Sequence, residues 1–166
     1  MDAKFLSEVS LFKGLEKDDL KHLVPHFKKV EVDAGTEIIK EGDTGVEMYI
    51  LYQGKVQISK TLVIKSSKTE FSNEDKTFIT LDSSVRPFFG ELGLLMADTR
   101  SATVKALTPC VLYAIDRTGF LNLCEDDYRI GFIIVKNISL VIAQRLKRNN
   151  EDLLKLTTAL SIALRK

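Results

Sequence analysis

The sequence lacks three features that would each point to a particular class of protein. Its 24 lysines and arginines nearly balance its 23 aspartates and glutamates, so the net charge of +1 gives no reason to expect a nucleic-acid or membrane partner. Its two cysteines, Cys110 and Cys124, have no CxxC spacing, which argues against a disulfide framework or a four-cysteine zinc site. Its longest apolar runs are only a few residues, and its N-terminus has no signal-peptide pattern. We therefore expect a cytoplasmic protein without a bound metal or cofactor.

The length of 166 residues, 45% of them hydrophobic, fits one folded domain with an appended helix. Changes in periodicity divide the chain into three zones. Residues 1–27 carry short helical patterns that end at Pro25, and residues 28–116 are rich in β-branched residues and punctuated by glycines. In residues 117–166 the apolar side chains recur at helical spacing.

The middle zone predicts a series of short antiparallel strands. The polar residues 66–75 have the composition of a hairpin tip between two of these strands. The spacing of the strands is typical of a β-sandwich or barrel, so we expect a mainly β protein with flanking helices. The seven candidates are residues 28–32, 36–40, 47–52, 55–64, 76–81, 103–107 and 111–115.

The last zone predicts a helix too long for one small domain. If residues 128–164 form one helix, its length at about 1.5 Å per residue is roughly 55 Å, and neither proline nor glycine follows Gly131. A narrow leucine seam favours a homodimer through this helix, as in a coiled coil. The alternative is a helix that breaks near Asn149 and Asn150 and folds back. The seam consists of Leu146, Leu153, Leu156, Leu160 and Leu164.

One segment, residues 89–104, combines features that suit an anionic ligand. Gly90 and Gly93 flank Glu91 and allow the backbone to approach a ligand closely. A helical turn that begins at Glu91 would direct free N–H groups at an anion. Arg100 follows nine residues after Glu91, and a tight turn would let its guanidinium fold back and bind two oxygens of that anion. The segment therefore holds groups for a phosphate and for a hydroxyl.

This segment resembles the phosphate-binding cassette of the cyclic nucleotide-binding domain family. The cassette pattern, F-G-E-L-(A/G/S)-L followed after a turn by R-(A/S/T)-A-T, is matched at every position from Phe89 to Thr103. Residues 35–43 and 48–56 are similar to the glycine-marked turns of the family's early strands. The resemblance implies an antiparallel β-roll, a double-stranded β-helix of jelly-roll type, with N-terminal helices before it and a long C-terminal helix after it.

By that resemblance, the Glu91 carboxylate would accept a hydrogen bond from the ribose 2′-hydroxyl, and Arg100 would pair with the exocyclic oxygens of the cyclic phosphate. Gly90, Leu92 and the peptide between Ser101 and Ala102 would supply backbone donors or room. A cyclic phosphodiester carries one negative charge, which a fixed guanidinium would balance. The implied function is a sensor domain that binds a cyclic purine nucleotide, does no covalent chemistry and relays ligand binding through its C-terminal helix.

The residues that would read the base are less specific. Counting along the C-terminal helix brings Asn149 and Asn150 to the position where relatives cover the base. An asparagine amide both donates and accepts hydrogen bonds, so it suits either adenine or guanine. Ser101 occupies a position where a hydroxyl favours guanine in some relatives and only contacts the phosphate in others. We expect cAMP as the ligand rather than cGMP.

Two further patterns suggest different chemistry. The triplet Asp43-Thr44-Gly45 is that of aspartic proteases, in which it lies in an apolar loop. Here Glu41 precedes it and Glu47 follows it, so we interpret it as part of a Gly-Asp-x-Gly β-turn in which glycine supplies a positive φ. His22 and His26 have the i, i+4 spacing of metal ligands on a helix, but Pro25 lies between them and no third ligand is near.

Two groups of charged residues also have interpretations that involve no ligand. Arg145, Lys147 and Arg148 form a small basic cluster, which we interpret as the solvated face of a helix because no helix-turn-helix unit follows within this chain. Glu91 and Arg100 could instead form a structural ion pair in a scaffold with a coiled-coil tail that binds no ligand.

Overall fold

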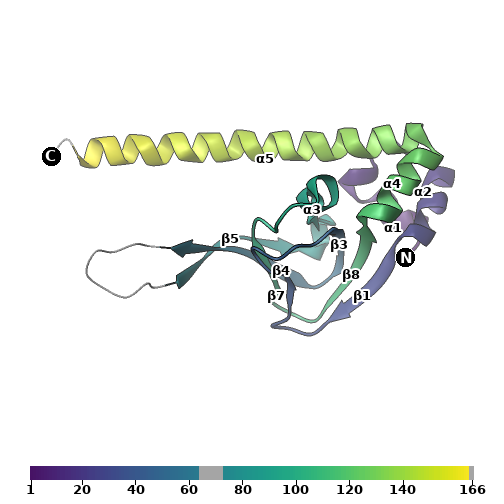
Figure 1. The fold of residues 1–166 in the computed structure, drawn as a ribbon, viewed down its shortest axis with the longest axis horizontal. Coiled ribbons are helices and arrows are strands. Elements are labelled where there is room, and N and C mark those ends of the chain that lie inside the picture. Colours follow the sequence, from purple (N-terminus) through teal and green to yellow (C-terminus); the bar gives the residue numbers. More distant parts are fainter. Residues whose placement is uncertain (64–72, 165–166) are drawn as a thin grey trace.

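The computed structural model describes residues 1–63 and 73–164, which form the antiparallel β-roll that the sequence predicts, with helices at one end and one long helix running along it (Figure 1). The strands make two four-stranded sheets in the orders β1-β8-β3-β6 and β2-β7-β4-β5, and every neighbouring pair is antiparallel. The strands are β1 (Lys28–Val32), β2 (Glu37–Ile39), β3 (Glu47–Gln53), β4 (Lys55–Val63), β5 (Asn73–Asp82), β6 (Phe88–Phe89), β7 (Thr103–Ala106) and β8 (Cys110–Asp116).

All seven predicted strands are present, with ends that differ by at most three residues. The prediction missed β6, because two residues are too few to show an alternating pattern. In β6, Phe88 pairs with Ile50 of β3 and Phe89 pairs with Tyr49. Of the predicted hairpin tip at residues 66–75, residues 66–72 lie outside the described residues, and β5 begins at Asn73.

Between the two sheets lies the first of two buried clusters, here called the sheet core. It forms because alternate side chains of each strand point inward, where burial of an aliphatic side chain stabilises the fold by about 1.5–3 kcal/mol. Its buried members are Ile39, Leu51, Val56, Phe89, Val104, Ala106, Cys110 and Leu112.

The second cluster, the helical core, lies between the sheet of β1, β8, β3 and β6 and the helices. It joins α1 (Ala3–Ser7), η1 (Ser10–Phe12), α2 (Lys17–Leu23), α4 (Arg117–Asp126) and the first part of α5 (Tyr128–Ala163). Polar contacts reinforce the packing: the Asn137 amide donates to the carbonyls of Leu11 and Lys13 at 2.8 and 2.9 Å, and Arg129 pairs with Asp19. The N-terminal helices are thereby fixed to the start of α5.

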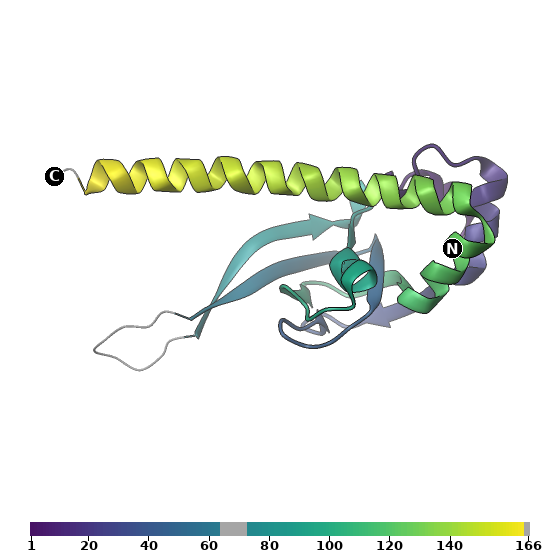
Figure 2. The same ribbon diagram turned by 45° about the horizontal axis from the view of Figure 1, so that its top comes forward.

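Helix α5 is one continuous helix of 36 residues, so the alternative of a break near Asn149 and Asn150 is wrong. At 1.5 Å per residue it is about 54 Å long. Its buried residues, the last of which is Ile138, lie in its first third, and the later part extends beyond the roll in the same direction as the β4–β5 hairpin (Figures 1 and 2). Leucines of the predicted seam are 58–77% exposed in this chain.

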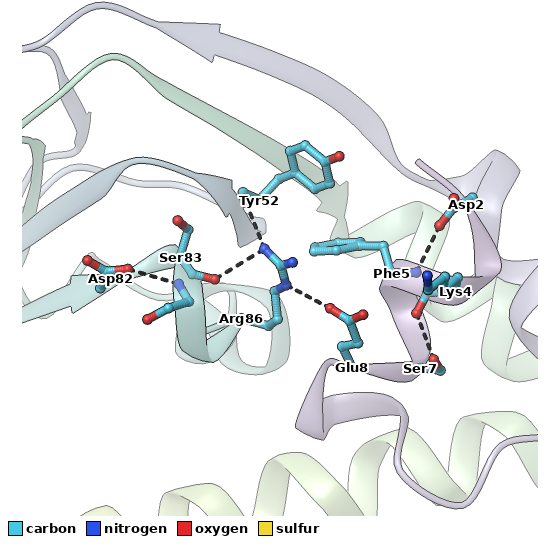
Figure 3. Close-up of polar contacts among 10 residues, drawn as sticks. Asp2, Lys4, Phe5, Ser7, Glu8, Tyr52, Asp82, Ser83 and Arg86 are labelled. Carbon is cyan, nitrogen blue, oxygen red and sulfur yellow. Dashed lines mark hydrogen bonds and ion pairs between the residues drawn. The ribbon is translucent and has the colours of Figure 1, made fainter.

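A cluster around Arg86 connects the N-terminal helix to the turn that leads into β6 (Figure 3). Arg86 follows η3 (Ser83–Val85) and has a left-handed backbone, with φ +48°. Its guanidinium lies 5.2 Å from the Phe5 ring centre, donates to the carbonyls of Tyr52 and Ser83 at 3.1 and 3.3 Å, and pairs with Glu8 at 3.0 Å. These contacts hold the entry to the predicted cassette in place.

Candidate functional site

A cavity of about 340 Å³ lies between the second sheet, the segment from Phe89 to Ala102 and helix α5. Its lining includes eight of the nine predicted site residues. The exception is Asn150, which follows Asn149 on α5 and is therefore turned about 100° around the helix. The predicted residues in the lining are Gly90, Glu91, Leu92, Gly93, Arg100, Ser101, Ala102 and Asn149, and they are joined by Ile39, Ile58, Phe89, Thr99, Val104, Ile142, Arg145 and Leu146.

Arg100 is buried on the wall of this cavity, with only 8% of its surface exposed. Its Nη1 donates to the carbonyl of Glu47 at 2.9 Å and to that of Gly90 at 3.4 Å, and its Nη2 lies 3.3 Å from the Glu47 carboxylate. Its backbone N–H donates to the carbonyl of Asp43 at 2.8 Å. The turn between β2 and β3 therefore fixes both the backbone and the side chain of Arg100.

Two glycines leave the space that the guanidinium occupies. A β-carbon on Gly45 would lie 2.4 Å from Arg100 Nε, and one on Gly93 would lie 2.4 Å from Nη1. Neither glycine has a positive φ, so the space and not the backbone conformation requires them. Gly93 lines the cavity as predicted, and it also makes room for Arg100 and for the carbonyl of Gly45.

The triplet Asp43-Thr44-Gly45 follows a turn that is closed by a hydrogen bond from Asp43 N–H to the carbonyl of Lys40 at 3.2 Å, in line with the β-turn interpretation. Gly42 has the positive φ of this turn, at +83°, whereas Gly45 does not. Thr44 forms an isolated bridge with Thr99, next to Arg100. The triplet therefore positions Arg100 through the backbone carbonyl of Asp43 and through the space that Gly45 leaves.

Glu91, the first residue of α3 (Glu91–Met96), is 5% exposed and faces the same cavity. Its carboxylate pairs with Arg145 of α5 at 2.5 Å. Arg145 also donates to the carbonyl of Phe88 at 3.3 Å, and its guanidinium lies 5.8 Å from the centre of the Phe88 ring. Arg145 is therefore part of the cavity wall, which corrects the prediction that it belongs to a solvated basic face.

The four charged groups of the site form two ion pairs, Arg100 with Glu47 and Glu91 with Arg145. The alternative of a structural ion pair between Glu91 and Arg100 is therefore wrong, since each pairs with another partner. Sequence reasoning missed Glu47 and Arg145 as site residues. The one available signal was that Arg145 precedes Asn149 by four residues, which places both on one face of a helix.

The phenol of Tyr49 lies beside the site, and its environment changes its pKa. Burial, and secondarily the nearby Glu47 carboxylate, raises the pKa of Tyr49. Its ring stacks on Phe89 with the centres 5.7 Å apart. The phenol therefore stays protonated at neutral pH and adds no charge beside the cavity.

The remaining candidates from the sequence lie elsewhere. The rings of His22 and His26 are 5.9 Å apart, and within residues 1–63 and 73–164 no group of three or more potential metal ligands comes together. In the same described part of the chain, no helix is both long enough and apolar enough to span a membrane.

Comparison with known proteins supports the assignment of residues 89–103 as a phosphate-binding cassette. The model of the cyclic nucleotide-binding domain family matches residues 29–127, more than half of the chain, and the chain belongs to this family. A cAMP-dependent protein kinase regulatory subunit from Yarrowia lipolytica is 31% identical over 123 residues, 74% of this chain and 29% of the relative. A cGMP-dependent protein kinase isozyme from Drosophila melanogaster is 32% identical over 111 residues, 67% of this chain and 9% of the relative.

The fold has a similar counterpart among solved structures. The Thermus thermophilus catabolite activator protein superposes with a TM-score of 0.76 at 26% identity, and the match covers 89% of this chain and 63% of that one. The chain spans less than a third of the length of either kinase relative. The family that it belongs to is defined by ligand binding and not by a catalysed reaction.

Proposed function

We propose that this chain binds a cyclic purine nucleotide in the 340 Å³ cavity, cAMP in preference to cGMP, and that it acts as a regulatory sensor. The observation that carries this proposal is the buried guanidinium of Arg100, which backbone carbonyls fix on the wall of a cavity that also contains the Glu91 carboxylate. A buried charge is costly to maintain, so its presentation to a cavity favours an anionic ligand.

The phosphate would occupy the space beside Arg100. Among the described residues, Arg100 forms its ion pair with Glu47, whose side chain is 43% exposed and can turn toward water. A cyclic phosphate offers two exocyclic oxygens in the planar geometry that a guanidinium binds best. The ligand would therefore take the place of the Glu47 carboxylate on Nη2 while the backbone contacts of Nη1 persist.

The ribose would lie against Glu91. A carboxylate has about four acceptor positions on its two oxygens, and Arg145 bonds to Oε1. The 2′-hydroxyl could donate to the remaining positions. A 2′-deoxy ligand would leave a buried acceptor without that partner, which costs about 1–3 kcal/mol.

The base would lie under α5, against Ile142, Leu146 and Asn149. These residues offer apolar surface and one amide, which alone do not distinguish adenine from guanine. The preference for cAMP is supported by the regulatory subunit of a cAMP-dependent kinase among the relatives, although a cGMP-dependent kinase also matches. We place Asn149, and not Asn150, at the base.

The output would pass through α5, since this helix supplies part of the cavity wall and also extends beyond the roll. Leu146, Leu153 and Leu160 recur every seven residues and are each 58–60% exposed. Such a repeat is typical of a two-stranded coiled coil. We propose that a second copy of this chain covers this seam, so that the two sensor domains respond together.

Calorimetric titration tests the proposed function. The wild-type chain is titrated with cAMP and cGMP, and the titration is repeated on Arg100→Ala. We expect binding of both nucleotides, tighter for cAMP, and a loss on the order of 2–5 kcal/mol in Arg100→Ala, as for truncation of one partner of a buried charge pair. The absence of heat with either nucleotide would favour the alternative, a scaffold with a coiled-coil tail.

A further inference from the structure

Both ends of the short helix α3 are held by arginines of the α4–α5 pair. At its first residue, Glu91 pairs with Arg145 of α5. At its last turn, the carbonyls of Leu94 and Leu95 accept hydrogen bonds from Arg117 Nη1, at 2.6 and 2.7 Å. Arg117 is the first residue of α4, and α4 is separated from α5 by Asp127 alone.

The contact of Arg117 satisfies groups that the helix cannot satisfy itself. The last carbonyls of a helix have no intrahelical donor and carry a partial negative charge, so a guanidinium there is favourable. The chain leaves α3 abruptly, because Ala97 adopts a left-handed conformation with φ +53°. Ala97 donates its N–H to the carbonyl of Gly93, the residue just before the two whose carbonyls accept from Arg117.

Packing brings α3 against both strand β3 and the helices. Leu94 is fully buried and belongs to the helical core, together with Phe120 of α4 and Ile134 of α5. Phe89, which precedes α3, belongs instead to the sheet core. Phe88, the other residue of β6, belongs to the helical core, so the two residues of β6 divide between the two cores and Leu94 of α3 lies on the helical side.

The two arginines differ in their exposure to a ligand. Arg145 lines the cavity and shares Glu91 with the proposed ribose, so a bound nucleotide changes its surroundings. Arg117 is not among the residues that line the cavity, and the carbonyls that it binds point away from Glu91 along the helix. A ligand can therefore alter the Arg145 contact while the Arg117 contact persists.

From this arrangement we infer that Arg117 is a positioning residue that couples α3 to α4 and α5, so that a displacement of α3 by ligand is transmitted to α5. This inference rests on the proposed function, because it requires a ligand at the cavity. The contact that would transmit the displacement, between Arg117 and the carbonyls of Leu94 and Leu95, lies outside the binding site.

The test separates binding from transmission. Affinity for cAMP is measured by calorimetry, and amide hydrogen exchange of α3 and of residues 128–145 is measured with and without cAMP. In the wild type we expect cAMP to change exchange in both regions. In Arg117→Gln we expect the dissociation constant to stay within about fivefold of wild type and the change in α3 to persist, while the change in residues 128–145 falls by at least half.

Three further variants complete the design. Arg117→Lys keeps a cation that can donate to both carbonyls, so we expect it to restore the response of residues 128–145. Arg129→Gln removes an arginine of the same helical unit that pairs with Asp19 and not with α3, so we expect it to keep that response. If Arg117→Gln does not fold, Arg117→Met keeps the apolar stem of the side chain and carries the same expectation.

The outcomes are distinguishable. A full response of residues 128–145 in Arg117→Gln, or a loss that Arg117→Lys does not restore, overturns the inference and leaves the proposed function intact. A purely structural role would lower the melting temperature and leave the ligand-dependent difference unchanged, which also overturns it. If the wild type binds neither cAMP nor cGMP, the proposed function fails and the inference fails with it.

Discussion

The guanidinium of Arg100 lies directly against the backbone of Gly45, so close that a β-carbon there would be 2.4 Å from Nε and 2.6 Å from Nη2. All three of the nearest atoms belong to the Arg100 side chain. A glycine in the turn before β3 thus determines where the charge of a residue 55 positions later can lie.

Replacement of Gly45 by alanine tests this relationship. Because the φ of Gly45 is not positive, alanine introduces no backbone strain and acts only by displacing the guanidinium. We expect a loss of cAMP affinity of at least tenfold, or about 1.4 kcal/mol, measured by calorimetry. Gly119→Ala is the control, since a β-carbon there meets its nearest neighbour at an ordinary 3.4 Å. Equal affinities for Gly45→Ala and wild type would contradict the placement of Arg100 at the phosphate.

Removal of the Glu47 charge should strengthen binding. Glu47 is the carboxylate that pairs with Arg100, and a phosphate would compete with it for Nη2. Because partly exposed pairs contribute about 0.2–1 kcal/mol, we expect Glu47→Gln to raise the affinity for cAMP by up to about fivefold. Glu37→Gln, at the exposed first residue of β2, controls for the general loss of a negative charge. Weaker binding in Glu47→Gln would mean that Glu47 supports Arg100 and does not compete with the ligand.

A double-mutant cycle tests the role of Glu91. Wild type and Glu91→Ala, which removes the acceptor oxygens, are each titrated with cAMP and with its 2′-deoxy analogue. If Glu91 accepts from the 2′-hydroxyl, the two changes are coupled, and we expect an interaction energy of about 1–3 kcal/mol. The cycle cancels the effect of leaving Arg145 without its partner, because both ligands experience it. Additive effects of the two changes would place the ribose elsewhere.

The proposed dimer seam makes a prediction about the later part of α5. Leu153→Lys places a charge in the seam, whereas Leu154→Lys places it about 100° around the helix at a similarly exposed leucine, 68% against 60%. We expect sedimentation analysis to show a dimer for wild type and Leu154→Lys and a monomer for Leu153→Lys. A wild-type monomer at all concentrations would rule the seam out as a dimer interface.

The contact between Asp19 and Arg129 predicts a pH dependence of stability. The hydrogen bond from Arg129 lowers the pKa of Asp19 from the ordinary 3.8 in the folded chain. The resulting stabilisation is fully present above 3.8 and is lost as the pH falls through the lower folded value. We expect Asp19→Asn to be less stable than wild type at pH 7 in urea unfolding, and the difference to shrink in acid. A difference that is independent of pH would assign the effect to packing alone.

How far the sequence could predict the site depends on how local each contact is. Residues from Gly90 to Ala102 form one contiguous motif, and their placement around a cavity follows from a tight turn. The ion-pair partners of Arg100 and Glu91 lie 53 and 54 positions away in the sequence, and no local sequence pattern predicts them. Only the pairing of distant strands and the path of α5 bring Glu47 and Arg145 to the site.

The fold shows the same division. Strands with alternating side chains and the unbroken run of α5 were predictable, because each follows from a period within the segment itself. Strand β6 was not, since its two residues are strand only through their pairing with Tyr49 and Ile50. The distinction between Asn149 and Asn150 likewise depends on how α5 is rotated against the roll, which packing of Ile134 and Ile138 sets.

A crystal structure of the chain grown with cAMP tests the central claim most directly. We predict the exocyclic oxygens of the phosphate at hydrogen-bond distance, about 2.7–2.9 Å, from the Arg100 guanidinium, with the 2′-hydroxyl on Glu91 and Glu47 released toward solvent. A nucleotide bound outside the cavity, or a phosphate that does not contact Arg100 while the pair with Glu47 stays closed, would contradict the account.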